Sequence, residues 1–536
     1  YKGPQGVPGV QQYYAEYGRG NNPYFVAYEW LYGHKKTDLY GYGRLSYKLG
    51  EHVNVALRSQ ITTWNQLRTE KVPFSAITYK TPDLRQGDYR EDRRNLLENN
   101  TDLLLTYNQQ LGKNFALSAV LGGNVRLFNY NSSWATTDFL IVPGVYNFSN
   151  SKNPTQSYDF GADMTVLSAY ATTDLSFKNY ANLGLTGRFD KNSTLPAANR
   201  TFFYPSVSLS TVLNEYVPLP EAISFVKLRG SYANVGGANT QYGIGSAYQA
   251  VTGNSVASLI GYGTEVTTSY DGPNYANQNT YTITKPYNNQ PAAGYTSTLA
   301  NPNLKPSRSS SYEFGLDAKF FGNRLGVDVT RFSTSNGRQI FSLPVASSSG
   351  YNSQLANAVT TLKRGWEVAV TGAVLANPRG LSWDILANWS TYKETLKDID
   401  GVEQSIYLAG PNHVFNIGDR LDGYYSYNYL RSPDGQIINS STGTPLVRPS
   451  GTNTLQFLGN TNPDWVWGVT NRFSYQNFNF SFQFDGRVGG VIRDQVYAYA
   501  LNSGNATDLV QGSLGAARLQ EWQSTSLGTK APTPAY

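Results

Sequence analysis

The chain has 536 residues with no Cys, one Met and 41 Tyr, and its net charge of +6 is spread along the sequence. The lack of Cys excludes disulfides, thiol catalysis and thiolate metal sites, and without a dense Lys/Arg block the pI near 9.0 does not indicate a nucleic-acid-binding stripe. A helical membrane protein is excluded, because no stretch approaches the roughly 18 consecutive apolar residues that such a helix needs. A β-barrel is compatible with the composition, because its strands are only half apolar.

In chain order, residues 1–37 predict a loop followed by strand-like residues, and a series of antiparallel hairpins follows. Short turns are predicted at 50–52, 112–114, 178–180, 322–323, 377–380 and 476–477. A further pair, 202–213 with 223–235, is joined by a longer turn that contains Pro218 and Pro220. Long loops are predicted at 65–97, 129–157, 236–306, 334–360 and 394–463, with some strand near 423–430. Residues 491–536 lose the alternation.

The clearest strand begins at Phe478, where four Phe residues at every second position face polar residues at the positions between them. A period of two indicates a β-strand with one aromatic and one polar face. Two environments explain such a strand. In a soluble antiparallel sandwich the Phe face lies in the core, whereas in a membrane barrel it contacts lipid and the polar face lines a lumen. This hairpin alone favours the sandwich.

Loop lengths reverse that preference. Short turns alternate with long loops along the chain, so the turns all lie at one end of the sheet and the loops at the other. Outer-membrane barrels have this arrangement, with short periplasmic turns and long extracellular loops, whereas a Greek-key sandwich has no reason to adopt it. We therefore predict an all-β chain that forms a large antiparallel transmembrane β-barrel.

Several motifs occur in the order typical of one family. The segment 168–215 combines a strand, a turn, an R-x-D strand end and Tyr204-Pro205-Ser206; 223–236 reads ISFVKLRGSYANVG; and 301–317 reads NPNLKPSRSSSYEFGLD, with Ser307 where Glu is usual. GWEV at 365–368 and the segment 458–490 continue the pattern. Over most of its length the chain resembles the SusC-like TonB-dependent transporters of the Bacteroidota outer membrane.

The resemblance implies a barrel of about 22 strands closed by an internal plug. It implies a SusD-like surface lipoprotein as a lid, energy from TonB–ExbB–ExbD, and import of oligosaccharides or, in some members, peptides. It implies no cofactor and no catalysed reaction. We recognise about 15 strands in residues 1–536 and no signal peptide, TonB box, N-terminal extension, plug or final strands. The chain is therefore expected to be a partial barrel domain.

The candidate chemical sites are weak. His34, His52 and His413 lie far apart in the sequence and none has ligand spacing such as HxxxH, so we interpret them as polar loop or turn residues rather than metal ligands. Asp92 reads as a solvated loop charge, and Asp317 with Asp328 as part of a charge ladder in the lumen rather than a catalytic pair. The Gly-rich pieces of the chain belong to loops, so nucleotide binding is not supported.

Two sets of residues are candidates for binding. Tyr side chains recur through the longest predicted loop and suit sugar rings or a partner protein, although they can also pack the loop against itself or the lid. These are Tyr242, Tyr248, Tyr262, Tyr270, Tyr275, Tyr281, Tyr287 and Tyr295. Four carboxylates on polar strand faces are expected to face the lumen: Glu313, Asp317, Glu367 and Asp384. On the opposite faces, Trp366, Trp383 and Trp389 are expected to contact outer-membrane lipid.

Three other readings compete with SusC-like import. A siderophore-type TonB-dependent receptor is disfavoured by the motifs, and a passive porin by the family resemblance. A secreted β-protein that binds or cleaves glycan is disfavoured by the loop pattern.

Overall fold

The computed structural model places most of the chain. The residues it describes are 21–76, 86–178, 180–237, 277–279, 281–287, 290–377, 379–399, 405–407, 414–426, 429–441, 446, 456–502, 506–512, 515–516 and 519. They form two compact units, the first made of 1–323 with 330–362 and the second of 324–329 with 363–536.

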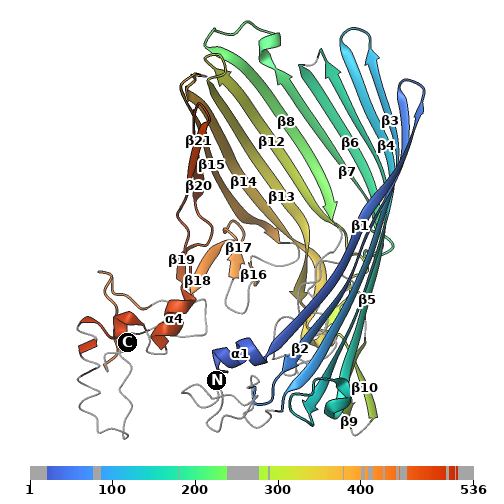
Figure 1. Ribbon diagram of the computed structural model, residues 1–536, viewed down its shortest axis with the longest axis vertical. Helices are drawn as coiled ribbons and strands as arrows, with labels where there is room; N and C mark the ends of the chain where they lie inside the picture. Colours follow the sequence, from blue (N-terminus) through green and yellow to red (C-terminus); the bar gives the residue numbers. More distant parts are fainter. Residues whose placement is uncertain are drawn as a thin grey trace. The chain divides into compact units, whose positions relative to one another are not determined.

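The first unit is an antiparallel sheet whose strands pair in chain order (Figure 1). Its strands are β1 (Leu31–Leu49), β2 (Val53–Val72), β3 (Asp88–Leu111), β4 (Phe115–Leu140), β5 (Ser151–Phe177), β6 (Ala181–Asn192), β7 (Thr201–Val212), β8 (Ile223–Gly237) and β12 (Ser307–Phe320). The sheet is completed by the later part of β13 (Leu325–Pro344) and the first part of β14 (Ser353–Leu375). The prediction of a large antiparallel sheet is confirmed.

Cross-strand register divides this sheet into two faces. Arg58 lies opposite Asp102, which lies opposite Asn124, and the row continues to Ser168 and Asp190. Directly paired residues point to the same side of a sheet, so these side chains define one surface, the polar face. The neighbouring row lies on the other side and defines the apolar face: Leu57, Leu103, Gly123, Ala169, Phe189 and Phe203.

Short turns join the hairpins where the sequence predicts them. The turn between β1 and β2 contains Gly50 with φ 78°, and the turn between β3 and β4 contains Gly112 with φ 66°. Glycine adopts this left-handed conformation without steric cost, so the two tight reversals are encoded locally. The pair β7–β8, with Pro218 and Pro220 in its connection, is also confirmed.

Three predicted long loops are mostly strand, and those predictions are wrong. Most of 65–97 belongs to the ends of β2 and β3, most of 129–157 to β4 and β5, and most of 334–360 to β13 and β14. The polar run at 88–94 resembles a loop in sequence because it lacks an apolar face. In the sheet its charges pair with one another: Asp92 is buried and accepts hydrogen bonds from Arg94, rather than being solvated.

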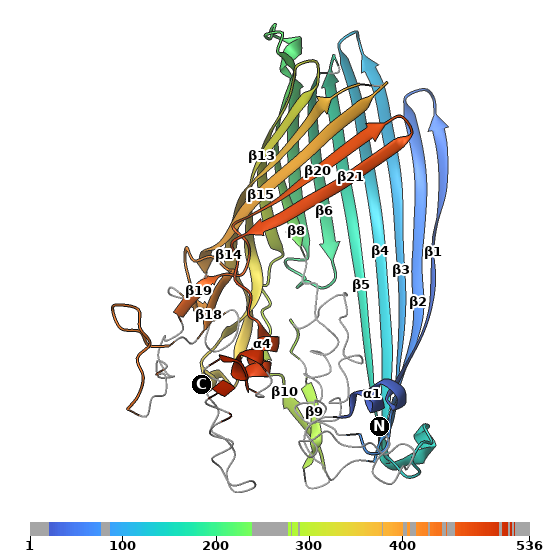
Figure 2. The ribbon, with the colours of Figure 1, turned by 60° about the vertical axis from the view of Figure 1, so that its left-hand side comes forward.

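The second unit contains β15 (Leu381–Ile399), β20 (Trp465–Tyr475) and β21 (Phe478–Val488), which pair in that order (Figure 2). The predicted hairpin with its turn at 476–477 is confirmed. The long 394–463 region contains two small antiparallel pairs, β16 (Ser405–Tyr407) with β17 (Val414–Asn416) and β18 (Gly423–Ser426) with β19 (Gln456–Asn460). Helix α4 (Gln495–Asn502) and the 3-10 turn η5 (Thr507–Leu509) follow where the alternation ends.

The remaining elements of the first unit are short. They are η1 (Phe148–Asn150), η2 (Leu213–Glu215), β9 (Tyr281–Tyr287), β10 (Gln290–Tyr295), β11 (Thr298–Leu299) and η4 (Ser347–Ser349). Helix α1 (Pro23–Glu29), which sequence reasoning missed, is capped by Asn22 and buries Phe25 with Trp30, Val72 and Ala76. Among the described helices, none has the length and apolar character required to cross a membrane.

Candidate functional site

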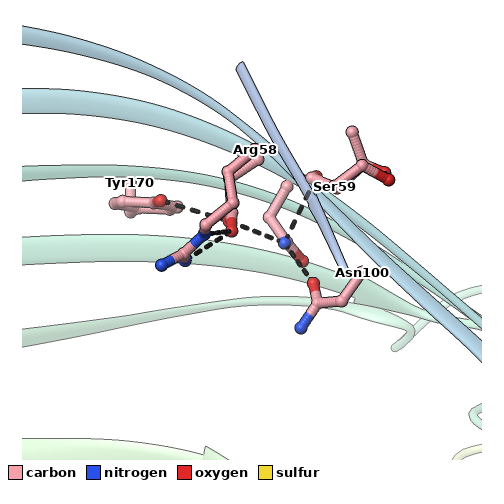
Figure 3. A network of polar contacts seen from close by, with 7 residues as sticks. Arg58, Ser59, Asn100 and Tyr170 are labelled. Atoms are coloured by element: carbon pink, nitrogen blue, oxygen red, sulfur yellow. Dashed lines mark hydrogen bonds and ion pairs between the residues drawn. The ribbon is translucent and has the colours of Figure 1, made fainter. Parts of the chain in front are cut away.

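A network of polar side chains lies on the polar face of the first unit (Figure 3). Its centre is Asp102 on β3, whose carboxylate accepts hydrogen bonds from Arg58 on β2 through Nε at 3.1 Å and Nη2 at 2.7 Å. The Asn124 side-chain amide on β4 donates to the same carboxylate at 2.7 Å, and the Tyr170 hydroxyl on β5 at 3.4 Å. One carboxylate therefore joins four consecutive strands.

A second cluster continues the network across β6 and β7. The Arg188 guanidinium donates to Asp190 at 2.8 Å and to the Ser168 hydroxyl at 2.8 Å, and its centre lies 5.5 Å from the Tyr170 ring. The Tyr204 hydroxyl donates to the same aspartate. The Tyr170 ring thus contacts both clusters, so the polar side chains form one connected belt from β2 to β7.

Burial within these ion pairs is unequal. The side chain of Arg58 is 49% exposed while that of Asp102 is 9% exposed, and the values for Arg188 and Asp190 are 37% and 12%. Arg126 on β4 donates to Glu98 on β3 at 2.6 Å, with exposures of 42% and 25%. In each pair the carboxylate lies against the sheet and the guanidinium points outward. The belt therefore presents cationic groups on alternate strands β2, β4 and β6.

Chemically, the belt is suited to binding. A guanidinium already paired with one carboxylate still has unused N–H groups, and half-exposed arginines can offer these to anions, hydroxyls or carbonyls of a passing molecule. The described part of the chain has no cluster of three or more His, Asp or Glu residues that could hold a metal ion.

The structure brings the predicted lumen carboxylates onto polar strand faces. Glu313 and Asp317 lie opposite Ser231 and Lys227, and this register puts them on the same polar face as the belt. In the second unit Asp384 lies opposite Arg472, on the side of β15 away from Trp383. Glu367 is exposed on β14 and alternates with the exposed Trp366. Whether these four residues face a lumen stays a prediction.

Of the eight predicted Tyr contacts, two lie together. Tyr281 on β9 and Tyr295 on β10 are direct cross-strand partners, both well exposed, with ring centroids 4.9 Å apart. Tyr287 belongs to β9, but its side chain lies outside the described residues, as do Tyr242, Tyr248, Tyr262, Tyr270 and Tyr275. The exposed ring pair has the flat surface that a sugar ring or an apolar peptide side chain would stack on.

Sequence reasoning missed the arginine belt. Arg58 and Asp102 are separated by a connection at 73–87 that does not set the register of β2 against β3, so no local signal brings them together. The pairing of Asp102 with Asn124 follows from the short turn at 112–114 and could have been found.

The apolar face carries aromatic side chains at two levels. At the turn end of the sheet, Phe115 contacts Phe177, which contacts Tyr180, with ring centroids 4.9 Å and 5.5 Å apart. At the second level, the pairs Phe189–Phe203 and Tyr232–Tyr312 have centroids 4.5 Å and 4.8 Å apart. In the second unit, Trp383 stacks on Phe473 at 5.5 Å, as the predicted aromatic face requires.

Comparison with known proteins gives consistent matches. The chain is 22% identical over 425 residues to "TonB-dependent receptor P26" of Formosa agariphila, covering 73% of this chain and 39% of that protein. It is 19% identical over 368 residues to "TonB-dependent receptor SusC" of Bacteroides thetaiotaomicron, covering 64% of this chain and 33% of that protein. The chain thus spans well under half the length of these curated relatives.

The fold is shared with a solved transporter. A structure of the RagAB peptide importer superimposes with a TM-score of 0.71 at 16% sequence identity, covering 90% of this chain and 51% of that chain. The family model described as "TonB dependent receptor-like, beta-barrel" matches residues 2–443. The predicted SusC-like resemblance and the β-barrel fold class are therefore confirmed, and the chain belongs to the TonB-dependent receptor-like β-barrel family.

Proposed function

We propose that the chain forms part of the wall of an outer-membrane transporter that imports oligosaccharides or peptides. The apolar face contacts lipid, and the polar face, with Glu313 and Asp317, lines the lumen. In the second unit, Glu367 and Asp384 likewise point to a lumen. Because the chain spans only part of its relatives, import is an activity of the longer protein. That protein would take energy from TonB–ExbB–ExbD and receive substrate from a SusD-like surface lipoprotein above the long loops.

The spacing of the two aromatic levels on the apolar face carries this proposal. The second level lies eight or nine positions from the turn end of each strand, as with Phe189 after Ala181 and Phe203 before Val212. At about 3.4 Å per residue and a tilt of 35–45°, the two levels lie about 20–25 Å apart along the membrane normal. Aromatic girdles flank an apolar band of about 25 Å in outer-membrane barrels.

Exposure of the intervening apolar side chains supports the same conclusion. Leu103, Leu167 and Leu209 lie between or beside the aromatic levels and are each at least 43% exposed. In water, a continuous apolar surface of this kind would favour association with other molecules. In a bilayer the same surface contacts lipid chains, so it carries no cost of exposure to water. A sandwich or a secreted glycan-binding protein would bury this face in its own core.

The polar face supports passage of a hydrophilic substrate. Its half-exposed arginines and the exposed Tyr281–Tyr295 pair offer hydrogen bonds and ring faces, which suit both oligosaccharides and peptides. These are binding groups, and we propose no catalysed reaction.

The proposed orientation of the strand faces can be tested by Cys labelling, because residues 1–536 contain no Cys and any Cys elsewhere in the longer protein can first be replaced by Ser. Single variants Glu313→Cys and Phe314→Cys would be introduced into the full-length protein in intact outer membranes. A hydrophilic maleimide should label the first and not the second, because neighbouring residues point to opposite faces. Equal labelling of both variants would refute the lumen-and-lipid assignment.

Transport itself is tested in cells that produce the full-length protein with its genomic neighbours. Depletion of oligosaccharides and peptides from the medium would be followed in wild-type cells, in cells lacking the transporter gene, and in cells lacking tonB. If both deletion strains fail to take up the same substrate class, the result supports TonB-energised import of that class. Uptake unaffected by loss of tonB would overturn it and favour a passive pore.

A further inference from the structure

The apolar face has a groove of about 490 Å³ across β2–β7. Its floor is formed by Gly123 and Ala169, which are direct partners on β4 and β5. Larger apolar side chains surround this floor: Leu57, Leu103, Val125, Leu167 and Phe189. The two small residues therefore leave a depression in a surface that is otherwise covered by Leu, Val and Phe.

One end of the groove carries a positive charge. Lys191 on β6 lines it beside Thr201 on β7, and the two residues are cross-strand partners. Asp190 also borders this end, but its side chain belongs to the polar face, where it accepts a hydrogen bond from Arg188. Both side chains are exposed. The groove thus combines an apolar channel with an ammonium group and a hydroxyl at one end, a combination that matches an amphipathic ligand with an anionic head.

The position of the groove along the strands indicates which ligand can reach it. Leu103 lies eight positions before the turn end of β3 at Leu111, and Lys191 lies ten positions after the start of β6 at Ala181. A tilted strand crosses the hydrocarbon in about 9–11 residues. The apolar part of the groove therefore lies within the half of the bilayer farther from the turns, and Lys191 lies at the level of its lipid head groups.

We propose that this groove binds an acyl chain of one outer-leaflet lipid whose phosphate contacts the Lys191 ammonium. The inference rests on the proposed outer-membrane location and adds a specific lipid site to it. A second protein chain is a weaker candidate occupant, because the charged end of the groove matches a phosphate head group.

The floor of the groove allows a clean perturbation. A Cβ added at Gly123 would meet only the Ser168 carbonyl oxygen, at 3.9 Å, so Gly123→Leu fills the channel without displacing the backbone. Gly41→Leu is the matched control, because Gly41 also lies on the apolar face, on β1, and its added Cβ would meet nothing within 4 Å. Lys191→Gln removes only the charge.

The full-length protein would be purified from outer membranes in mild detergent, and retained lipid measured by native mass spectrometry. The bound lipid would then be exchanged against added phosphatidylglycerol and phosphatidylcholine to measure the preference for an anionic head group. We expect wild type and Gly41→Leu to retain a phosphate-bearing lipid, and Gly123→Leu to retain at least about 10-fold less, which corresponds to about 1.4 kcal/mol. Lys191→Gln should lose about 5-fold of the preference for the anionic lipid, as expected for one lysine at a membrane surface.

Equal lipid retention by wild type and Gly123→Leu would overturn the proposed site, as would retention of lipid by neither. Dimers that dissociate only in Gly123→Leu would assign the groove to a second copy and also overturn it. Cell fractionation separates these results from failure of the proposed function. If the protein fractionates with the outer membrane but Gly123→Leu does not change its lipid retention, only the proposed lipid site is refuted.

Discussion

The ion pair between Arg58 and Asp102 allows a quantitative test of the polar belt. Truncation of Arg58 leaves a carboxylate that is only 9% exposed, although Asn124 and Tyr170 still donate to it. A fully buried unpaired charge costs about 3–5 kcal/mol. Because the guanidinium is 49% exposed, water can replace much of its contact, and we expect Arg58→Ala to cost about 1–2 kcal/mol.

The double-mutant cycle isolates the pair itself. In Asp102→Ala the arginine regains water and Asn124 keeps its bond to Asn100 at 2.5 Å, so the cost should again be about 1–2 kcal/mol. We expect a coupling energy between Arg58 and Asp102 of about 1 kcal/mol, because water solvates about half of the Arg58 side chain.

The assay is equilibrium unfolding of the full-length protein in urea, with refolding into detergent to establish reversibility. Arg44→Ala is the control, because Arg44 lies directly opposite Arg58 on β1 and is exposed. Its cost should stay within about 0.5 kcal/mol. A coupling energy near zero would show that the belt contributes no stability through this pair, and a value above about 3 kcal/mol would show that it is far less solvated than its exposure indicates.

Three further predictions concern other parts of the chain. Phe482→Lys on the aromatic face of β21 lies four positions from the turn, near the bilayer midplane, and should cost about 2–4 kcal/mol and reduce outer-membrane assembly, while Gln483→Lys on the opposite face should assemble normally, as measured by heat-modifiable migration. Phe25→Ala removes a fully buried ring and should accelerate hydrogen exchange across α1, at a cost of about 3–4 kcal/mol; unchanged exchange would contradict the packing. Burial would raise the pKa of Asp422, but hydrogen bonds and charge from Arg420 outweigh burial and hold that pKa below 3.8. The ionised Asp422 therefore stabilises the folded state above pH 3.8, and this stabilisation is lost as pH falls through the lowered pKa. In the wild type the protection factor of the Asn462 amide, which donates to Asp422 at 3.3 Å, should therefore fall in acid, whereas in Asp422→Asn it should not change with pH.

The polar ends of the long strands show where pattern reasoning fails. Glu70 and Arg90 are both nearly fully buried and form an ion pair at 3.1 Å, and the Trp30 indole donates to Glu70 at 2.7 Å. In sequence these charges have no apolar alternation around them, so they resemble a loop. Pairing with partners 20 and 40 positions away makes strand possible there, and no window of sequence contains that information.

The sequence by itself determined the strand faces, the tight turns and the registers across those turns. The turn at 112–114 places Asn124 opposite Asp102, and the turn at 178–180 places Arg188 opposite Tyr170, because a short turn permits only one pairing. Only the tertiary structure decided that Arg58 pairs with Asp102 and that Gly123 lies beside Ala169. The paired strands are joined by the long connections 73–87 and 141–150, and connections of this length do not fix the register of β2 against β3 or of β4 against β5. The register there is set by interactions spread over whole strands, including the ion pairs of the polar belt.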